Sequence, residues 1–464
     1  MYKRQFLSCK KEQLITNSSA ILTFSSPDVS FDTVFTTIGS ATRYFKVYNK
    51  NSQAIKITSL KLGGGINSNF RINVDGVATI TSNAIEIAAN DSVYVFVAVT
   101  VNPTNSNSPL VIMDSIIFET NGNLQKVYLE AWGQDAYYHK PSEFQGISFI
   151  KQNDVWLNDK PHIIYDYAIV DSASTLTILP GTRIYMHKSA VLWISKDATL
   201  SIQGNHNSPV VIEGDRREIT FQNIPGQWGR IWLSAGSINN TINWAIIKNG
   251  NIGVHLDTLG NSTNPTLTIE NTIIKNMLAA AIFAQGSSIA AANCVFANCG
   301  EYVAALTLGG NYNFTHCTFA NYWENSNRQK PTLFINNWYK DISNIIRPRD
   351  LDNAYFANCI IYGSEINEVG FDSLSIGGKF NYKFQNCLLK ITNTENTSNA
   401  YHYNTIYKNQ DPLFKDTRIN DYNLLPLSPS INKGDVAIGK KYPIDLNNKS
   451  RINDIAPDLG AYEQ

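Results

Sequence analysis

The first third of the chain alternates apolar and polar residues with a period of two. Ile55–Leu62 alternates over its whole length, and Ser92–Val99 is a largely apolar run suited to a central strand. Asn121-Gly122-Asn123 separates two further apolar stretches and has the composition of a hairpin turn. Short strands at this spacing predict an immunoglobulin-like β-sandwich over residues 26–134, without the Cys…Trp…Cys core of the disulfide type.

Two segments without this alternation flank the predicted sandwich. Residues 13–26 are rich in Ser, Thr and Asn, so we expect a signal and tether over residues 1–25. Polar residues, Gly and Pro interrupt the pattern after Gly133, which predicts a linker over residues 135–150.

The rest of the chain repeats one short motif, a polar residue, Cys and two further residues that are mostly apolar. It occurs at Asn293–Phe296, His316–Phe319, Asn358–Ile361 and Asn386–Leu389. Two earlier segments, at Asn243–Ile246 and Asn271–Ile274, fit the pattern with the cysteine replaced. A repeat of roughly 20–30 residues is typical of a solenoid, in which each unit must stack on the next to bury its apolar face. We therefore predict an all-β chain with a solenoid over residues 151–408.

The repeated positions predict a structural ladder inside this solenoid. The cysteines concerned are Cys294, Cys317, Cys359 and Cys387, and the asparagines are Asn293, Asn358 and Asn386. Small apolar thiols suit a buried stack, and Asn tolerates the left-handed backbone of a sharp turn. A Cys294–Cys299 disulfide remains an alternative. The scattered histidines and the lack of a CxxC pair predict no metal site.

Composition narrows the classes of partner. The chain has 38 basic and 38 acidic residues, so it lacks the basic surface that nucleic-acid binding needs. No apolar run reaches the roughly 18 residues that a membrane span requires. We therefore expect no nucleic-acid partner and no membrane-spanning segment.

Five stretches of the chain resemble those of known protein families. Leu176–Thr182 and Trp228–Leu233 resemble the first coils of right-handed parallel β-helices. Phe6-Leu7-Ser8-Cys9, followed by Lys-Lys-Glu, resembles the end of a bacterial lipoprotein signal. The C-terminal stretches SPSINKGD and DLGAYE resemble the closing segment of Bacteroidetes surface β-helix lipoproteins.

The resemblance implies a fold and a location. It implies a right-handed β-helix closed at its open end by a cap over residues 409–464. It also implies a lipid on Cys9 and a place in the outer membrane, surface-exposed or facing the periplasm. A stray terminal cysteine is the alternative for Cys9.

Two charged clusters and one aromatic group are the candidates for chemistry. Asp215 with Arg217, and Arg349 with Asp350, could serve a lyase or hydrolase, which needs carboxylates beside a base. Ca²⁺ enters only if the chain is such a lyase, and no other cofactor is expected. Solvated turns with local ion pairs are the alternative reading of both clusters.

Aromatic residues mark the longest interruption of the repeat. Trp323, Trp338 and Tyr339 lie between the Cys317 and Cys359 units, where they could stack on sugars or pack on the coil below. We therefore predict a non-catalytic adhesion or glycan-binding protein whose partner is a polysaccharide or cell-surface glycan. The alternatives are a polysaccharide lyase or glycoside hydrolase, and a purely structural envelope role.

Overall fold

The computed structural model describes residues 13–36, 39–102, 110–141, 147–217, 219–259, 263–374, 377–453 and 455–464. The chain divides into two compact units at Ala136/Tyr137. Cys9, the predicted lipidation site, lies outside the described residues.

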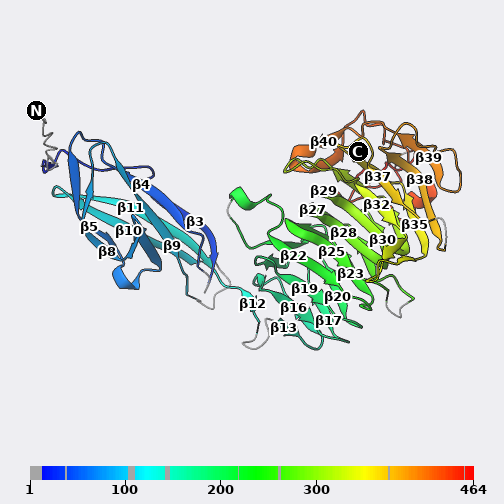
Figure 1. Ribbon diagram of the computed structural model, residues 1–464, viewed down its shortest axis with the longest axis horizontal. Coiled ribbons are helices and arrows are strands. Elements are labelled where there is room, and N and C mark those ends of the chain that lie inside the picture. Colours follow the sequence, from blue (N-terminus) through cyan, green and yellow to red (C-terminus); the bar gives the residue numbers. More distant parts are fainter. Residues whose placement is uncertain are drawn as a thin grey trace, which may run out of the picture. The chain divides into compact units, whose positions relative to one another are not determined.

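The first unit is a sandwich of two sheets (blue to cyan in Figure 1). One sheet contains β1 (Leu14–Ile15), β5 (Ala54–Leu62), β10 (Leu110–Thr120), β11 (Asn123–Gln134), β3 (Asp28–Phe35) and β8 (Thr81–Ile87). The other contains β2 (Thr23–Phe24), β4 (Arg43–Tyr48), β9 (Ser92–Val99), β6 (Phe70–Val74) and β7 (Val77–Thr79), and η1 (Gly65–Asn67) lies in a loop. The predicted β10–β11 hairpin is confirmed, because Asn121 and Gly122 both have positive φ, as its two-residue turn requires.

The expected tether belongs in part to this sandwich. β1 pairs with β5, β2 pairs with β4, and Ala20 and Leu22 are buried in the sandwich core. The side chains of Asn121 and Asn123 donate to backbone carbonyls between Asn17 and Ala20. The polar composition of this segment therefore reflects edge strands tied down by side-chain hydrogen bonds.

The second unit is a parallel β-helix, with coils that follow one another from β13 to β38 in Figure 1. Its strands stack in three columns, which we call faces A, B and C in the order in which each coil visits them. Face A contains β12 (Tyr137–His139), β15 (His162–Ile164), β18 (Arg183–Met186), β21 (Val210–Gly214), β24 (Ala245–Lys248), β27 (Ile273–Met277), β29 (Val295–Cys299), β31 (Thr318–Asn321) and β36 (Ile360–Gly363). Face B contains β13 (Ile147–Ile150), β16 (Tyr167–Val170), β19 (Val191–Ile194), β22 (Trp228–Leu233), β25 (Gly250–Leu256), β32 (Leu333–Asn336) and β37 (Val369–Asp372). Face C contains β14 (Asp154–Trp156), β17 (Thr175–Ile178), β20 (Thr199–Gln203), β23 (Asn240–Asn243), β26 (Leu267–Glu270) and β35 (Leu351–Ala357).

Four longer strands bend around a corner and belong to two faces each. They are β28 (Ala280–Ala292) and β30 (Tyr302–Thr315) on faces B and C, and β38 (Phe380–Leu389) and β39 (Tyr403–Lys408) on faces C and A. The remaining elements are β33 (Trp338–Lys340), β34 (Ile346–Pro348), β40 (Phe414–Asp416), β41 (Asp421–Leu424), η2 (Ile219–Phe221), η3 (Thr417–Ile419) and α1 (Val436–Gly439).

The β-helix begins inside the segment expected to be a linker. β12 pairs with β15 and β13 pairs with β16, so the first coil starts at Tyr137 rather than at residue 151. The rings of His139, Trp156 and His162 stack at 4.2 to 5.3 Å between centroids and fill this first end of the solenoid. Two very short strands in a polar stretch left no periodic signal, which is why the sequence indicated a linker.

The repeated motif forms the corner between faces C and A. The four repeat cysteines are fully buried in the solenoid core, and Cys317 and Cys359 touch through a 3.4 Å N–H···S contact. All five cysteines among the described residues are free, so Cys294 and Cys299 form no disulfide. Burial raises the pKa of the Cys317 and Cys387 thiols well above its usual value.

Positive φ values mark the turn of this corner. They occur at Trp244, Asn271, Asn293, His316, Asn358 and Asn386, with φ between 48° and 53°. The first repeat is therefore one residue out of the expected register, because Trp244 rather than Asn243 stacks beneath Asn271.

The C-terminal segment covers the outside of face A (orange and red in Figure 1). Outward residues of this face are apolar and are buried beneath it. They are Val295, Ala297, Ala320, Ile360 and Leu388, and the covering residues include Phe414, Tyr422, Leu424, Leu459 and Tyr462. Asn420 reaches as far back as Asn276 and Asn298. Residues 409–464 therefore lie alongside several coils, not across the last one as predicted.

Buried polar contacts fix this segment to the ladder. Arg451 is 1 % exposed and donates to Glu463 at 2.9 Å, to the Asn293 side chain at 3.2 Å and to the Gly460 carbonyl at 3.1 Å. The Asn358 amide exchanges hydrogen bonds with the Asp435 backbone. The predicted ladder residues thus also hold the covering segment.

Candidate functional site

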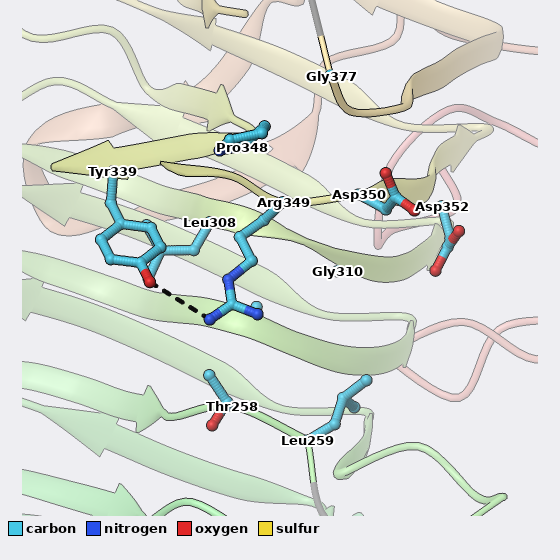
Figure 2. Close-up of a pocket in the computed structure, with 11 residues that line it drawn as sticks. Thr258, Leu259, Leu308, Gly310, Tyr339, Pro348, Arg349, Asp350, Asp352 and Gly377 are labelled. Carbon is cyan, nitrogen blue, oxygen red and sulfur yellow. Dashed lines mark hydrogen bonds between the residues drawn. The ribbon is translucent and has the colours of Figure 1, made fainter. Parts of the chain in front are cut away.

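An open groove of about 810 Å³ lies at the corner between faces B and C of the β-helix. Coils turn here through Thr258 and Leu259, through Gly286, and through Leu308–Gly310. The β33–β34 hairpin is inserted at the same corner between β32 and β35, and Tyr339 and Pro348 of this hairpin line the groove (Figure 2).

The tight corners leave little side-chain bulk in the groove. Gly309 and Gly310 have φ values of 70° and 118°, which L side chains rarely adopt. A Cβ at Gly310 would lie 2.4 Å from the Ser287 carbonyl oxygen, so no larger residue fits. The glycines therefore allow this coil to turn tightly against its neighbours beside the hairpin.

Arg349 and Tyr339 form the central pair of the groove. The guanidinium donates to the Tyr339 hydroxyl at 3.4 Å and lies 5.5 Å from the ring centroid. Figure 2 shows Arg349 extending from the β34–β35 connection toward Thr258. Among the described residues no carboxylate lies within ion-pair distance of Arg349, so its charge is available to a ligand.

Two carboxylates lie beside this pair. Asp350 and Asp352 both line the groove and are exposed. Lys379 binds Asp352 at 2.9 Å and Asp350 at 3.8 Å, and the hydrogen bond with Asp352 raises the pKa of Lys379. The two carboxylates therefore share one ammonium at the open side of the groove.

The other predicted charged pair lies on a different face. Asp215 follows β21 of face A, where it contacts His187 Nδ1 at 2.6 Å. Arg217 donates to the Tyr185 hydroxyl at 2.5 Å, with its guanidinium 4.9 Å from the ring centroid. Neither residue lines the groove, so Asp215 and Arg217 do not join Arg349 and Asp350 in one site.

Of the three aromatic candidates, only Tyr339 lines the groove. Trp323 is 7 % exposed, lies between β31 and β32, and donates to Ser326 at 2.8 Å. Trp338 is half-buried, and its indole N–H has no partner among the described residues. Trp323 is therefore a packing residue, which is the alternative considered from the sequence.

An aromatic and charged ladder on the outside of face B was missed from the sequence. Trp193 and Trp232 stack at 4.4 Å, and Trp232 donates to Asp257 at 2.9 Å. Arg230 lies 2.8 Å from His255 Nδ1, which makes this nitrogen the acceptor and leaves the proton on Nε2, 3.2 Å from Asp257. Burial raises the pKa of Asp257, but hydrogen bonds from His255 and Trp232 outweigh it and the net pKa is lowered.

This ladder supports the groove rather than forming a second one. Trp193 and Trp232 each cover one face of the other, and Tyr167 and His255 flank the pair on its two outer sides, so the indoles pack within the ladder. Asp257 precedes Thr258, so the network fixes the chain where it enters the groove. A signal existed in the sequence, because Trp193, Trp232 and His255 occupy the same outward position of successive coils.

No group of three or more His, Cys, Asp or Glu gathers as a metal site within the described ranges. No helix there is long and apolar enough to cross a bilayer.

A family model described as "Right handed beta helix region" matches residues 167–319. A search of the curated proteins finds no match. Among solved structures, the catalytic domain of a GH87 alpha-1,3-glucanase in complex with nigerose is 11% identical, with 74% of this chain and 82% of that chain covered and a TM-score of 0.21. The VesB protease of Vibrio cholerae is 15% identical (26% and 33% covered, TM-score 0.17), and a family 123 glycoside hydrolase from Clostridium perfringens is 10% identical (30% and 30%, TM-score 0.19). The chain spans about a third of the length of these last two structures, and likenesses this weak carry no argument about function. The strand pairing and the family match together give a right-handed parallel β-helix.

Proposed function

We propose that this protein is a non-catalytic glycan-binding or adhesion protein, and that the B–C corner groove binds a segment of polysaccharide. The observation that carries the proposal is the Tyr339–Arg349 pair in an open groove, with an aromatic ring and a guanidinium that has no carboxylate partner among the described residues. Extended sugar chains need an open groove, hydrogen-bonding groups and a ring for their apolar faces.

The polar groups of the groove suit sugar hydroxyls. Arg349 offers several N–H donors in a fixed plane, and Asp350 and Asp352 accept hydrogen bonds on the other side (Figure 2). The exposed Thr258 hydroxyl adds a group that can donate or accept. This mixture favours a glycan over an apolar ligand.

The proposal includes a place at the bacterial cell surface. A lipid on Cys9 would attach the protein to the outer membrane, with the sandwich between the anchor and the β-helix. The resemblance of residues 6–12 to a lipoprotein signal supports this attachment.

Affinity electrophoresis of the full chain against a panel of polysaccharides tests the groove. We expect Tyr339→Ala and Arg349→Ala each to weaken binding about tenfold or more, because each removes a contact that only the bound state completes. Arg217→Ala is a matched control, since Arg217 also bonds a tyrosine hydroxyl and lies over its ring, but outside the groove. Equal retardation of all three variants and the parent would overturn the proposal.

The enzymatic alternative rests on Asp350 and Asp352 beside Arg349, because paired carboxylates are what a glycoside hydrolase needs. An assay for new reducing ends and for unsaturated sugars on the same polysaccharides distinguishes it. Product formation that Asp350→Asn abolishes would make the protein an enzyme. Binding without products supports the non-catalytic proposal.

A further inference from the structure

The outer face of the second sandwich sheet carries a cluster of exposed aromatic rings. Tyr44 on β4 is 61% exposed and Tyr94 on β9 is 38% exposed, with their ring centroids 5.6 Å apart. Phe96 completes the cluster, at 5.9 Å from Tyr44 and 6.0 Å from Tyr94. The planes of Tyr94 and Phe96 lie within 16° of parallel.

These rings do not contribute to the sandwich core. Phe45, Val47, Val95 and Val97 alternate with them and are buried between the sheets. Residues that alternate with core positions face solvent, where polar side chains are the usual choice. Large exposed rings gathered on such a face indicate a binding surface.

The paired outward positions of this face carry charge of a single sign, and one acidic residue, Asp75, follows them at the end of β6, where its N–H donates to the Tyr94 carbonyl at 3.0 Å. The paired positions are Thr23, Tyr44, Lys46, Tyr48, Arg71, Asn73, Ser92, Tyr94, Phe96 and Ala98. Two of them are basic and none is acidic. Arg71 uses its guanidinium on the backbone carbonyls of Ser68 and Phe70, whereas the Lys46 ammonium lies 4.6 Å from the Tyr94 ring centroid. Lys46 is therefore the cation that remains for a ligand.

We infer that this surface, which we call the ring platform, is a second glycan-binding site and that its ligand is an anionic polysaccharide. The C–H face of a sugar ring packs on Tyr44 and Phe96, and a carboxylate or sulfate group on the sugar pairs with Lys46. This site is separate from the groove and lies on the other unit of the chain.

Other partners fit the platform less well. An apolar protein surface would bury the Lys46 ammonium and the tyrosine hydroxyls without partners. Single-stranded nucleic acid also stacks on rings, but it carries a charge on every nucleotide and needs a basic groove along its backbone. The Lys46 ammonium beside three rings suits a chain in which charged groups are spaced by sugar rings.

The test is affinity electrophoresis of the full chain in polygalacturonate, dextran sulfate and neutral dextran. All proteins carry Arg349→Ala, so that the groove does not contribute. We expect retardation in at least one of the anionic polymers and little in dextran, and a loss of tenfold or more in the Tyr44→Ala/Phe96→Ala variant. Lys46→Ala should weaken binding and reduce its dependence on salt concentration.

Tyr128→Ala is the matched control, because Tyr128 is also 61% exposed but lies on β11 in the other sheet. The melting temperature of each variant is measured first. If Tyr44→Ala unfolds the sandwich, Tyr44→Phe replaces it, because this variant keeps the ring. Retardation that does not change in the double variant would overturn the platform. Equal retardation by neutral dextran would overturn the requirement for an anionic sugar. Retardation in polygalacturonate alone would identify a carboxylate as the group that pairs with Lys46, and retardation in dextran sulfate alone would identify a sulfate.

Discussion

Single residues at the C–A corner combine a backbone role with a packing role. Asn271, Asn293, Asn358 and Asn386 all adopt the left-handed conformation, which Asn accepts more easily than most residues. Their amides then bond to the next coil or to the covering segment, as in Asn293 to Asn271 at 3.3 Å. One residue type therefore turns the chain and joins the coils.

Asn358 provides the sharpest test of this double role. Its amide contacts His316 at 3.0 Å and both accepts from and donates to the Asp435 backbone, at a φ of 53°. We expect Asn358→Ala to lower the free energy of unfolding by about 3 kcal/mol, from lost buried hydrogen bonds and a strained turn. Asn358→Gly keeps the turn and should lose less in chemical denaturation. An alanine variant as stable as the parent would contradict this.

Histidines at the first end of the solenoid make its stability depend on pH. Burial lowers the pKa of His139 to about 3 and that of His162 to about 4, so the unfolded chain binds protons first as pH falls below about 6.5. The contribution of these two histidines to stability should be constant above pH 6.5 and decline toward pH 4, by about 2 kcal/mol per histidine at pH 5.

Thermal unfolding between pH 4 and 8 measures this effect. His139→Asn should flatten the acid decline, whereas His206→Asn, at an exposed position, should leave it unchanged. A melting temperature that is independent of pH between 4.5 and 7 would rule out the buried neutral pair.

At the scale of elements, a buried ion pair fastens the segment between β31 and β32 to the next coil. Arg328 and Glu368 are 4% and 0% exposed and bond twice, at 2.6 and 2.9 Å. Glu368 also accepts from the Thr332 backbone and hydroxyl and from the Glu365 N–H. Every carboxylate oxygen is satisfied, so the pair fixes where the segment lies.

Glu368→Gln should lower the free energy of unfolding by about 3 kcal/mol, because it leaves the Arg328 charge buried without a counter-charge. Asp416→Asn is the control, since Asp416 pairs with the exposed Arg418 and its loss should not be measurable. Denaturant titration compares the Glu368→Gln and Asp416→Asn variants. Equal unfolding midpoints would show that the Glu368 charge does not stabilise the fold.

The sequence predicted the elements best where one pattern repeats over several coils. The buried cysteines and left-handed asparagines appeared at the predicted corner because each coil must turn there and fill the same space. The predicted register of the first repeat was wrong by one residue. Trp244 occupies the left-handed position there, and a tryptophan does not match the polar residue that the motif requires. The C-terminal segment was placed at the wrong surface, since a sequence motif does not reveal which face of a solenoid it covers.

The groove could be predicted only in part, because coil stacking assembles it. Arg349 and Asp350 were predicted as one charged pair and Tyr339 as an aromatic contact, but the hairpin register that joins them leaves no sequence signal. Thr258 and Gly310 come from earlier coils, and only the stacking order places them at the same corner.

At the scale of the whole molecule, the two units have separate hydrophobic cores. One core is built from residues 20–131 and the other from residues 150–403, with no residue in common. Units with their own cores unfold independently unless their interface is large. We expect calorimetry of the full chain to resolve two transitions, each reproduced by one of the fragments 1–136 and 137–464. A single transition that neither fragment reproduces would show coupling.

The covering segment has a consequence for how the protein is made. Translation delivers the coils first, while the outward apolar residues Val295, Ala320 and Ile360 wait for Leu459 and Tyr462. Until Leu459 and Tyr462 are made, the growing chain exposes an apolar surface along several finished coils, and such a surface promotes aggregation. A truncation that removes Leu459 and Tyr462 should therefore yield an insoluble or degraded product instead of a slightly shorter soluble protein. The solubility of the finished coils thus depends on a segment made well after them.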